Sequence, residues 1–141
     1  MIKIGTSGYS YDDWKEIFYP RSLKKKNYLA HYANFFDITE INFTYYRLPT
    51  PEIIENIREK VSDDFKFVVK LSKELTHERN KAEESVEQFR AGIEPLVKSN
   101  QLITTLAQFP YSFKPGQDSY DHLRFLREAM PDLRIKVEVR N

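Results

Sequence analysis

The chain has 141 residues, a length that suits one ordinary domain, and 40% of them are hydrophobic, which is enough for a packed core. Its 22 basic and 21 acidic residues leave a net charge of +1, so no basic footprint for nucleic acid is present and nucleic acid is an unlikely partner. The chain has no cysteine, which excludes disulfides, thiolate catalysis and cysteine zinc sites and fits a cytoplasmic protein.

No segment marks the chain for a membrane. The N-terminal residues lack the long apolar stretch of a signal peptide, and no run approaches the roughly 18 apolar residues of a membrane span. We therefore expect a cytoplasmic protein with no membrane partner.

Strand-like and helix-like segments alternate through the first half of the chain. Residues Ile2 to Gly5 form a short β-type run that opens into a small polar turn, Thr6 to Gly8. The stripe of an amphipathic helix follows from Lys25 to about Asp37, and Ile38 to Phe43 reads as the second strand. Thr50 can cap the next helix, with a proline in its first turn.

The alternation continues in the second half. Phe65 to Leu71 is the third expected strand, and a charged loop separates it from a helix whose apolar stripe runs from Val86 to Leu96. Gln101 to Phe109 is the fourth strand, a helix begins near Asp118, and Ile135 to Arg140 is the fifth strand. Strands that alternate with helices predict parallel pairing through right-handed crossovers, hence an α/β fold.

Polar residues inside the strands favour a barrel over an open doubly wound sheet. Charged residues alternate with apolar ones from Ile135 to Arg140, whereas a central strand of an open sheet is apolar on both faces. Glu40, Lys70 and Gln108 also stand late in their strands, as expected where strand ends line the mouth of a barrel. Because the strand ends of an open sheet also bind ligands, the polar pattern favours a barrel without excluding an open sheet.

Six short stretches, each at the end of an expected strand or in the loop after it, together resemble one known family. They are Gly5-Thr-Ser-Gly8 with Tyr11 and Trp14; Glu40-Ile-Asn42 with Thr44 and Tyr46-Arg-Leu-Pro49; Phe65-Lys-Phe67 with Lys70; Thr76-His-Glu-Arg79; Gln108-Phe-Pro110 with Phe113; and Glu138-Val-Arg140. In this order they resemble the YecE-like family of barrel proteins, also called domain of unknown function 72. The chain departs from that pattern at Tyr9, Tyr111 and Asn141; at the last of these a histidine is usual, and a potential acid or base is lost.

The resemblance implies a TIM-like parallel β/α barrel but brings no settled activity, substrate or cofactor. A complete barrel of this kind needs about 250 residues and eight strands. We therefore expect residues 1–141 to be a single domain, the front part of such a barrel with about five of its eight strands, from which the C-terminal strands are missing. If the chain really ends at Asn141, the open edge strands predict self-association; alternatively the sequence represents part of a longer chain.

Glu40 and Glu138 are the candidate catalytic carboxylates. On strands two and five they would lie near the barrel mouth, where a pair of carboxylates can do acid and base work or hold a divalent metal. The structural alternative is a network of ion pairs with Lys70, Lys136 and Arg140. The sequence does not decide which metal or cofactor, if any, is used.

Three further groups join these candidates. Lys70 and Arg140, together with Ser7 in its polar turn, can receive a phosphate or a carboxylate, or they can neutralise the two glutamates. His77 can act as acid, base or metal ligand, or it can simply be solvated. His31 and His122 fall within expected helices and are read as structural, so a zinc site built from a histidine pair is unsupported.

Aromatic and amide side chains complete the set. Five aromatic residues cluster near the first two strand ends: Tyr9, Tyr11, Trp14, Tyr45 and Tyr46. Packing is favoured for Tyr11 and Trp14, and a place in a ligand-stacking wall is favoured for Tyr46.

Two amides, Asn42 and Gln108, can orient a ligand or form hydrogen bonds with one another.

The leading hypothesis is an enzyme acting on a small polar, anionic or sugar-like substrate. The alternative is a non-catalytic binding module for a partner or nucleic acid.

Overall fold

The computed structural model describes residues 2–140 and is built around one parallel sheet. Its strands are β1 (Gly5–Ser7), β2 (Ile38–Ile41), β3 (Lys66–Lys70), β4 (Leu102–Gln108) and β5 (Ile135–Glu138). Each strand pairs in parallel with the strand that follows it in the chain, giving the order β1-β2-β3-β4-β5. A β/α barrel has this sequential order, whereas an open doubly wound sheet reverses its order at a switch point.

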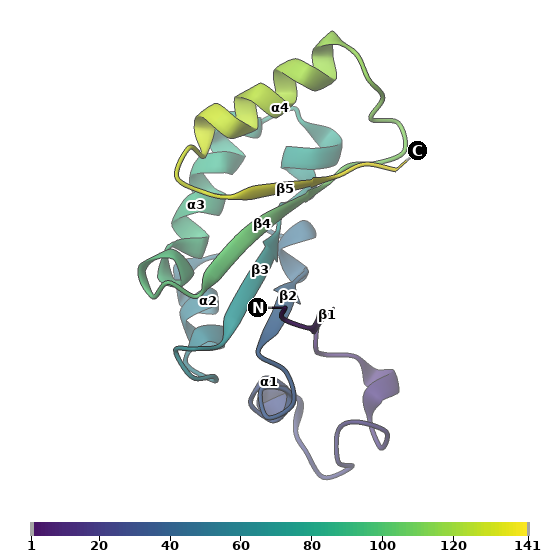
Figure 1. The fold of residues 1–141 in the computed structure, drawn as a ribbon, viewed down its shortest axis with the longest axis vertical. Helices are drawn as coiled ribbons and strands as arrows, with labels where there is room; N and C mark the ends of the chain where they lie inside the picture. Colours follow the sequence, from purple (N-terminus) through teal and green to yellow (C-terminus); the bar gives the residue numbers. More distant parts are fainter. Residues whose placement is uncertain (1, 141) are drawn as a thin grey trace.

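The longer helices lie on one side of this sheet (Figure 1). They are α2 (Pro51–Arg58), α3 (Ala82–Lys98) and α4 (Gln117–Ala129), preceded by the shorter α1 (Tyr28–Tyr32). One-turn helices are η1 (Asp12–Trp14), η2 (Lys25–Asn27) and η3 (Phe43–Tyr45), and η4 (Glu74–Glu78) is a π-helical turn. Sequential parallel strands with helices on one face make the fold an incomplete TIM-like β/α barrel, as the sequence predicted.

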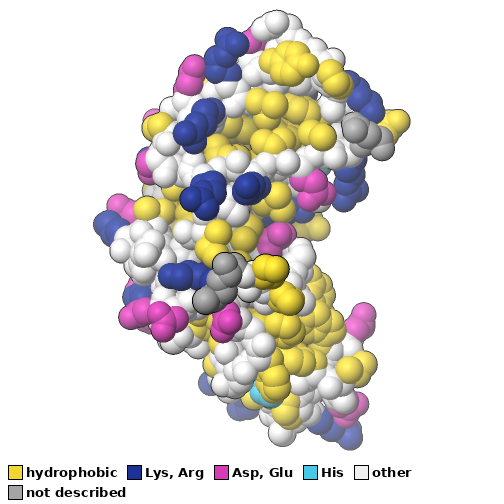
Figure 2. All heavy atoms as spheres, in the orientation of Figure 1, with side chains coloured by type: hydrophobic (Ala, Val, Ile, Leu, Met, Phe, Trp, Pro, Cys, Tyr) yellow, Lys and Arg dark blue, Asp and Glu magenta, His cyan; other side chains and the backbone are white. Residues whose placement is uncertain are grey.

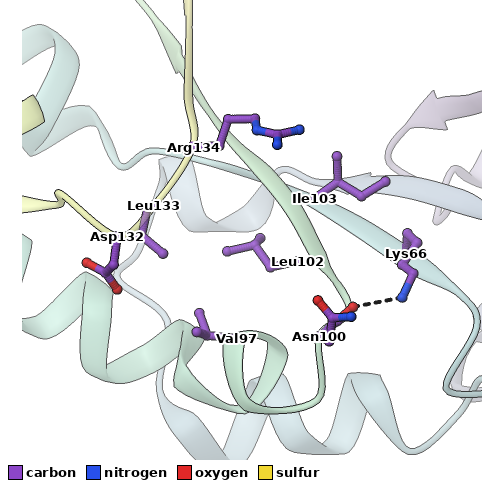
Figure 3. A pocket seen from close by; sticks show the side chains of 8 residues that line it. All are labelled: Lys66, Val97, Asn100, Leu102, Ile103, Asp132, Leu133 and Arg134. Atoms are coloured by element: carbon purple, nitrogen blue, oxygen red, sulfur yellow. Dashed lines mark hydrogen bonds between the residues drawn. The ribbon is translucent and has the colours of Figure 1, made fainter.

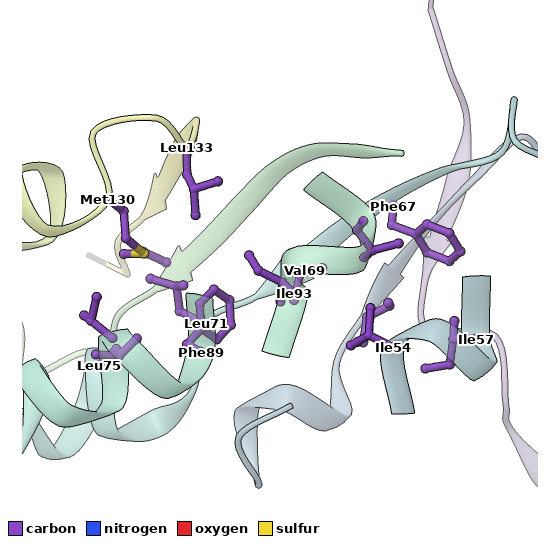
Figure 4. Packing of buried hydrophobic residues seen from close by; sticks show 14 of the residues in the cluster. Ile54, Ile57, Phe67, Val69, Leu71, Leu75, Phe89, Ile93, Met130 and Leu133 are labelled. Carbon is purple, nitrogen blue, oxygen red and sulfur yellow. The ribbon is translucent and has the colours of Figure 1, made fainter. Parts of the chain in front are cut away.

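The two faces of the sheet differ in burial, because the helices cover only one of them. On β3, Phe67 and Val69 are fully buried, while the alternating Lys66, Val68 and Lys70 on the opposite face are only partly buried. Figure 4 shows the apolar side chains of β3 packed against those of α2 and α3. At about 25 cal/mol per Å² of apolar surface, this layer between sheet and helices is the main source of stability.

Local sequence sets the start of α2. Thr50 has extended backbone, its Oγ1 accepts a hydrogen bond from the Ile53 amide at 3.4 Å, and Pro51 occupies the first turn. A proline there costs nothing, because the first-turn amides have no partner within the helix. Both features confirm the predicted helix start. Ile54 and Ile57 then face the core.

The first strand was placed wrongly from the sequence. The predicted run from Ile2 to Gly5 is not a strand: Ile2 and Ile4 are 89% and 72% exposed, and β1 begins at Gly5. Pairing with β2 determines the strand instead, because Gly5 opposes Ile38, the first residue of β2. Thr6, expected in a turn, is held in the strand by the Tyr32 hydroxyl, which contacts both its amide and its Oγ1.

Other boundaries also differ from the predicted ones. The first helix ends at Tyr32 rather than near Asp37, and β2 ends at Ile41 because Phe43 begins the one-turn helix η3. The fifth strand ends at Glu138, two residues before the predicted limit. Asn141, whose departure from the family pattern we noted, lies outside the described residues.

The last strand is less covered than the others. Val137 and Val139, two of the apolar residues that alternate with charged ones from Ile135 to Arg140, are about half exposed, and Figure 2 shows hydrophobic side chains gathered around α4 and β5. Across residues 2–140, no helix combines the length and apolar character that a membrane crossing requires.

Candidate functional site

Polar residues end the strands of the sheet at one edge, which we call the mouth. The last residue of β1, β3, β4 and β5 is, respectively, Ser7, Lys70, Gln108 and Glu138. The second strand contributes Glu40 and, directly after its end, Asn42. Because the strands are parallel, their carboxyl ends meet at the same edge, where β/α barrels carry their active sites.

One hydrogen-bonded chain crosses three strands. Lys70 Nζ donates to Gln108 Oε1 at 2.6 Å, and Gln108 Nε2 donates to Glu138 Oε1 at 2.6 Å. The amide of Gln108 is therefore oriented by both neighbours, and it separates the ammonium group from the carboxylate. Lys70 also lies 5.1 Å from the centre of the Tyr45 ring, in cation–π range.

A second chain joins the first two strands. Asn42 Nδ2 donates to Ser7 Oγ at 2.8 Å, and Ser7 Oγ donates to Glu40 Oε1 at 2.9 Å. The other side-chain atom of Asn42, Oδ1, is buried and has no hydrogen-bond partner within residues 2–140. An unpaired buried acceptor costs about 1–3 kcal/mol, so this oxygen is suited to accept a hydrogen bond from a ligand.

The two candidate carboxylates make no ion pair in the described part of the chain. No Lys, Arg or His nitrogen of residues 2–140 lies within 4.0 Å of a Glu40 or Glu138 oxygen. Their recorded partners, Ser7 and Gln108, are neutral. The ion-pair network considered as the structural alternative is therefore absent among these residues.

A cavity of about 580 Å³ opens at the mouth. It is lined by Tyr11, Asn42, Phe43, Tyr45, Tyr46, Lys70, His77, Gln108, Phe109, Pro110 and Arg140. Three of these side chains are basic and none is acidic. Its size suits a small molecule, and its mixture of aromatic walls and a few polar groups is typical of ligand sites.

His77 reaches this cavity from the π-helical turn after β3. The turn ends at Arg79, whose φ of 57° lies in the left-handed region. The His77 ring lies 5.1 Å from that of Tyr45, and its Nδ1 is 2.9 Å from Thr76 Oγ1. Burial lowers the pKa of His77, and the positive charges of Lys70 and Arg140 lower it further, against a smaller opposite effect of Glu78.

Aromatic residues divide between the cavity and the core. Tyr45 and Tyr46 meet edge to face at 5.0 Å, and Tyr46, favoured as a site residue, lines the cavity. Tyr11 lines it too, while its ring packs against that of Trp14 at 5.0 Å between centres, and its hydroxyl donates to the Ser7 carbonyl. Tyr9 and Trp14 instead pack against the hydrophobic core.

The structure thus sorts the predicted site residues into two groups. Six line the cavity: Asn42, Tyr46, Lys70, His77, Gln108 and Arg140. The other three, Ser7, Glu40 and Glu138, each stand one or two hydrogen bonds behind a lining residue. Sequence reasoning missed Phe43 and Phe109 as lining residues. Their positions directly beside the ends of β2 and β4 were the available signal.

The other two histidines lie outside the mouth cavity, and each contacts a backbone carbonyl. The Nε2 atom of His31 is 3.2 Å from the Phe18 carbonyl in an aromatic cluster, and His122 Nε2 is 2.6 Å from the Leu75 carbonyl. Within residues 2–140, no group of three or more histidine or carboxylate side chains is arranged to hold a metal ion.

A second cavity, of about 560 Å³, lies at the opposite, amino-terminal ends of β3 and β4 (Figure 3). Two of its charged groups already have partners: Lys66 donates to the Asn100 carbonyl at 2.7 Å, and Asp132 pairs with Arg90 at 2.6 Å. Leucine, isoleucine and valine make up much of its remaining lining. The mouth, with its unpaired charges, is the stronger candidate.

These observations define the chain as part of a TIM-like β/α barrel with a polar mouth at its strand ends. The sequence model of the family described as "Protein of unknown function DUF72" matches residues 3–141, and the chain belongs to this family.

The names of the curated relatives state no chemical activity. UPF0759 protein YunF of Bacillus subtilis is 29% identical over 147 residues, covering 100% of this chain and 51% of the relative. UPF0759 protein YecE of Escherichia coli K12 is 29% identical over 119 residues, covering 83% of this chain and 40% of the relative. The chain therefore spans about half the length of the curated relatives it matches.

Solved structures agree with the fold. A DUF72 family protein from Thermotoga maritima superposes with a TM-score of 0.86 at 39% identity, covering 99% of this chain and 56% of that one. A DUF72 family protein from Enterococcus faecalis gives a TM-score of 0.86 at 25% identity, covering 100% of this chain and 51% of that one.

Proposed function

We propose that the mouth is the active site of an enzyme that acts on a small polar substrate, anionic or sugar-like. The observation that carries this proposal is the cavity itself, whose charged lining is wholly basic while two carboxylates stand just behind it. Lys70 and Arg140 bind the negative or oxygen-rich part of the substrate. Asn42, Ser7 and Gln108 orient it by hydrogen bonds, and Tyr46 forms part of the wall.

The glutamates and His77 supply proton transfer. Glu138 is exposed and Glu40 partly exposed, and each accepts one hydrogen bond from a neutral group. A carboxylate that no cation neutralises can take up or release a proton as a substrate changes charge. Because burial and nearby cations keep the pKa of His77 low, its imidazole is neutral at pH 7 and can accept a proton.

The experiment uses Glu138→Gln, which keeps the shape of the side chain and removes its charge. The purified protein is incubated with a metabolite extract, and mass spectrometry follows which compounds are consumed. We expect wild type to consume at least one polar, anionic or sugar-like compound, and Glu138→Gln to lose that activity. Glu128→Gln, on the exposed side of α4, is the matched control and should behave as wild type.

Two outcomes would overturn the proposal. One is equal consumption by wild type and Glu138→Gln; the other is a wild-type protein that consumes nothing in the extract. If such an inactive protein retains a ligand, the alternative of a non-catalytic binding module is favoured, and the 76% exposure of Tyr46 provides a surface for it. Salt-sensitive capture of a polynucleotide would extend that alternative to nucleic acid.

A further inference from the structure

The basic lining of the cavity is the most specific feature of the mouth. Three basic side chains line this cavity: Lys70 at the end of β3, His77 on η4, and Arg140, which follows β5. The recorded partners of Lys70 are the neutral amide of Gln108 and the ring of Tyr45. Arg140 has no carboxylate within 4.0 Å among residues 2–140.

The amount of charge indicates what kind of anion would balance it. Lys70 and Arg140 present two permanent positive charges to the cavity, whereas Glu40 and Glu138 stand behind its lining, and a single carboxylate monoanion would match only one of these two charges at the lining. A phosphate monoester carries about −1.5 to −2 at pH 7 and three acceptor oxygens, so it matches the charge and offers one oxygen to each of the three basic side chains. Arginine, with its planar fork of donors, is well suited to bind such a group in a bidentate manner.

Other lining groups describe the rest of the ligand. The buried Oδ1 of Asn42 needs a donor, and a hydroxyl group supplies one. Tyr45 and Tyr46 offer an aromatic wall against which the carbon skeleton of a sugar can pack. We propose that Lys70, Arg140 and His77 bind the phosphoryl group of a phosphate monoester, and that its hydroxylated remainder lies between Asn42 and the tyrosine wall. This inference rests on the proposed function, because it takes the mouth to be the substrate site.

His77 gives this subsite a measurable signature. The charged groups that act on it are Lys70, Arg140 and, from its own turn, Glu78, with Tyr45 packed against its ring. In the free protein, burial and the two cations keep the pKa of His77 below its ordinary value, so the ring is neutral at pH 7. A bound dianion reverses the sign of the nearby charge, so the imidazole takes up a proton on binding.

The test is isothermal titration calorimetry of the purified protein at pH 7.0, in two buffers with different ionisation enthalpies. The probes are glucose 6-phosphate, inorganic phosphate, malonate and glucose. We expect glucose 6-phosphate to bind at least tenfold more tightly than glucose or malonate, with proton uptake that His77→Gln abolishes. Lys70→Met and Arg140→Met should each weaken binding about tenfold or more, since a charged hydrogen bond contributes about 1.5–3 kcal/mol.

The matched control is Lys136→Met, which removes a positive charge from the same strand as Glu138 but outside the cavity lining. It should bind glucose 6-phosphate as wild type does, and circular dichroism should show that all four variants are folded. Binding that survives both Lys70→Met and Arg140→Met would overturn the inference. Equal affinity for malonate and glucose 6-phosphate would do the same.

These results are separable from those on the proposed function. If an unphosphorylated compound is consumed in a Glu138-dependent way while phosphate esters do not bind, the phosphoryl subsite is wrong and the enzyme proposal stands. If glucose 6-phosphate binds through Lys70 and Arg140 but no compound is consumed, the subsite stands and the catalytic proposal fails.

Discussion

Gln108 donates a hydrogen bond from Nε2 to Glu138 Oε1 over 2.6 Å. Its other amide atom, Oε1, accepts from Lys70 Nζ, also over 2.6 Å. One neutral side chain thereby holds a cation and an anion on the strands to either side of β4 without letting them neutralise each other. The positive charge of Lys70 stays available to the cavity because of this arrangement.

Replacing Gln108 by glutamate tests that role with almost no change in volume. The new carboxylate would pair with Lys70 and face the carboxylate of Glu138, so it would cancel the positive charge and add a repulsion. We expect the affinity of the protein for inorganic phosphate to fall about tenfold or more, measured by calorimetry at pH 7. The free energy of unfolding should change by no more than about 1–2 kcal/mol, because these groups are only partly buried.

Gln108→Leu is the companion variant. It removes both hydrogen bonds but leaves the charge of Lys70 intact, so phosphate affinity should fall less than in Gln108→Glu. If the two variants lose the same affinity, orientation of Lys70 rather than its free charge governs binding. If neither loses any, the amide has no part in the site.

His122 makes the stability of the protein depend on pH. Burial lowers its pKa and is the largest effect, the hydrogen bond to the Leu75 carbonyl raises it by a smaller amount, and the positive charge of Arg79 lowers it by the least. The unfolded chain therefore binds more protons than the folded one below the ordinary histidine pKa of about 6.5. It follows that stability falls as the pH drops below about 6.5.

Urea unfolding at pH 7.5 and pH 5.5 measures this effect. Wild type should lose more free energy of unfolding between the two values than His122→Gln, whose amide does not titrate yet can still donate to the Leu75 carbonyl. His77, whose pKa is also lowered, contributes in the same direction, so the double variant should show the smallest loss. An identical loss in wild type and in the double variant would contradict the assignment.

Phe89 belongs to the apolar layer between α3 and the sheet. Its side chain is fully buried, and Figure 4 draws it next to Leu71. Phe89→Ala should cost about 3–5 kcal/mol, through lost burial and the cavity left behind. Val97→Ala on the same helix, where the side chain is 40% exposed, should cost less than about 1 kcal/mol by the same urea titration.

The sequence predicted the parts of the fold that hydrophobic periodicity controls. The stripe on α3, the capped start of α2 and the central strands β3 and β4 all lie where they were expected, within one or two residues. The first strand was misplaced because its residues are polar. Pairing with β2 and the hydroxyl of Tyr32, 26 positions away, hold Thr6 in the strand, and no local pattern reveals either contact.

The meeting of the polar strand ends at one edge was predictable, but the arrangement of their side chains was not. Late positions in parallel strands indicated that Glu40, Lys70, Gln108 and Glu138 share an edge, and they do. Which of them line the cavity depends on side-chain rotamers and on the π-helical turn that carries His77. The sequence suggested only a charged loop there, because a single π turn has no recognisable period.

Gly92 fixes how closely α3 approaches the start of α2. A Cβ built on it would lie 2.3 Å from the carbonyl oxygen of Pro49 and 2.7 Å from the carbonyl carbon. In an open helix interior, Gly→Ala stabilises a protein by about 1 kcal/mol. Here the added methyl group must push two packed elements apart, which costs about 1–3 kcal/mol and opposes that gain.

We therefore expect Gly92→Ala to lower the free energy of unfolding by about 1 kcal/mol, and Gly92→Val to lower it further because its side chain is larger and β-branched. Gly116→Ala is the control: no heavy atom lies within 4 Å of a Cβ there, and φ is 170°, so the change should be within about 0.5 kcal/mol. Pro49 precedes the loop residue that caps α2, so the displacement should also weaken protection of the first α2 amides in hydrogen exchange. A Gly92→Ala protein more stable than wild type would show that the two elements can separate freely, and the close approach would then have no structural role.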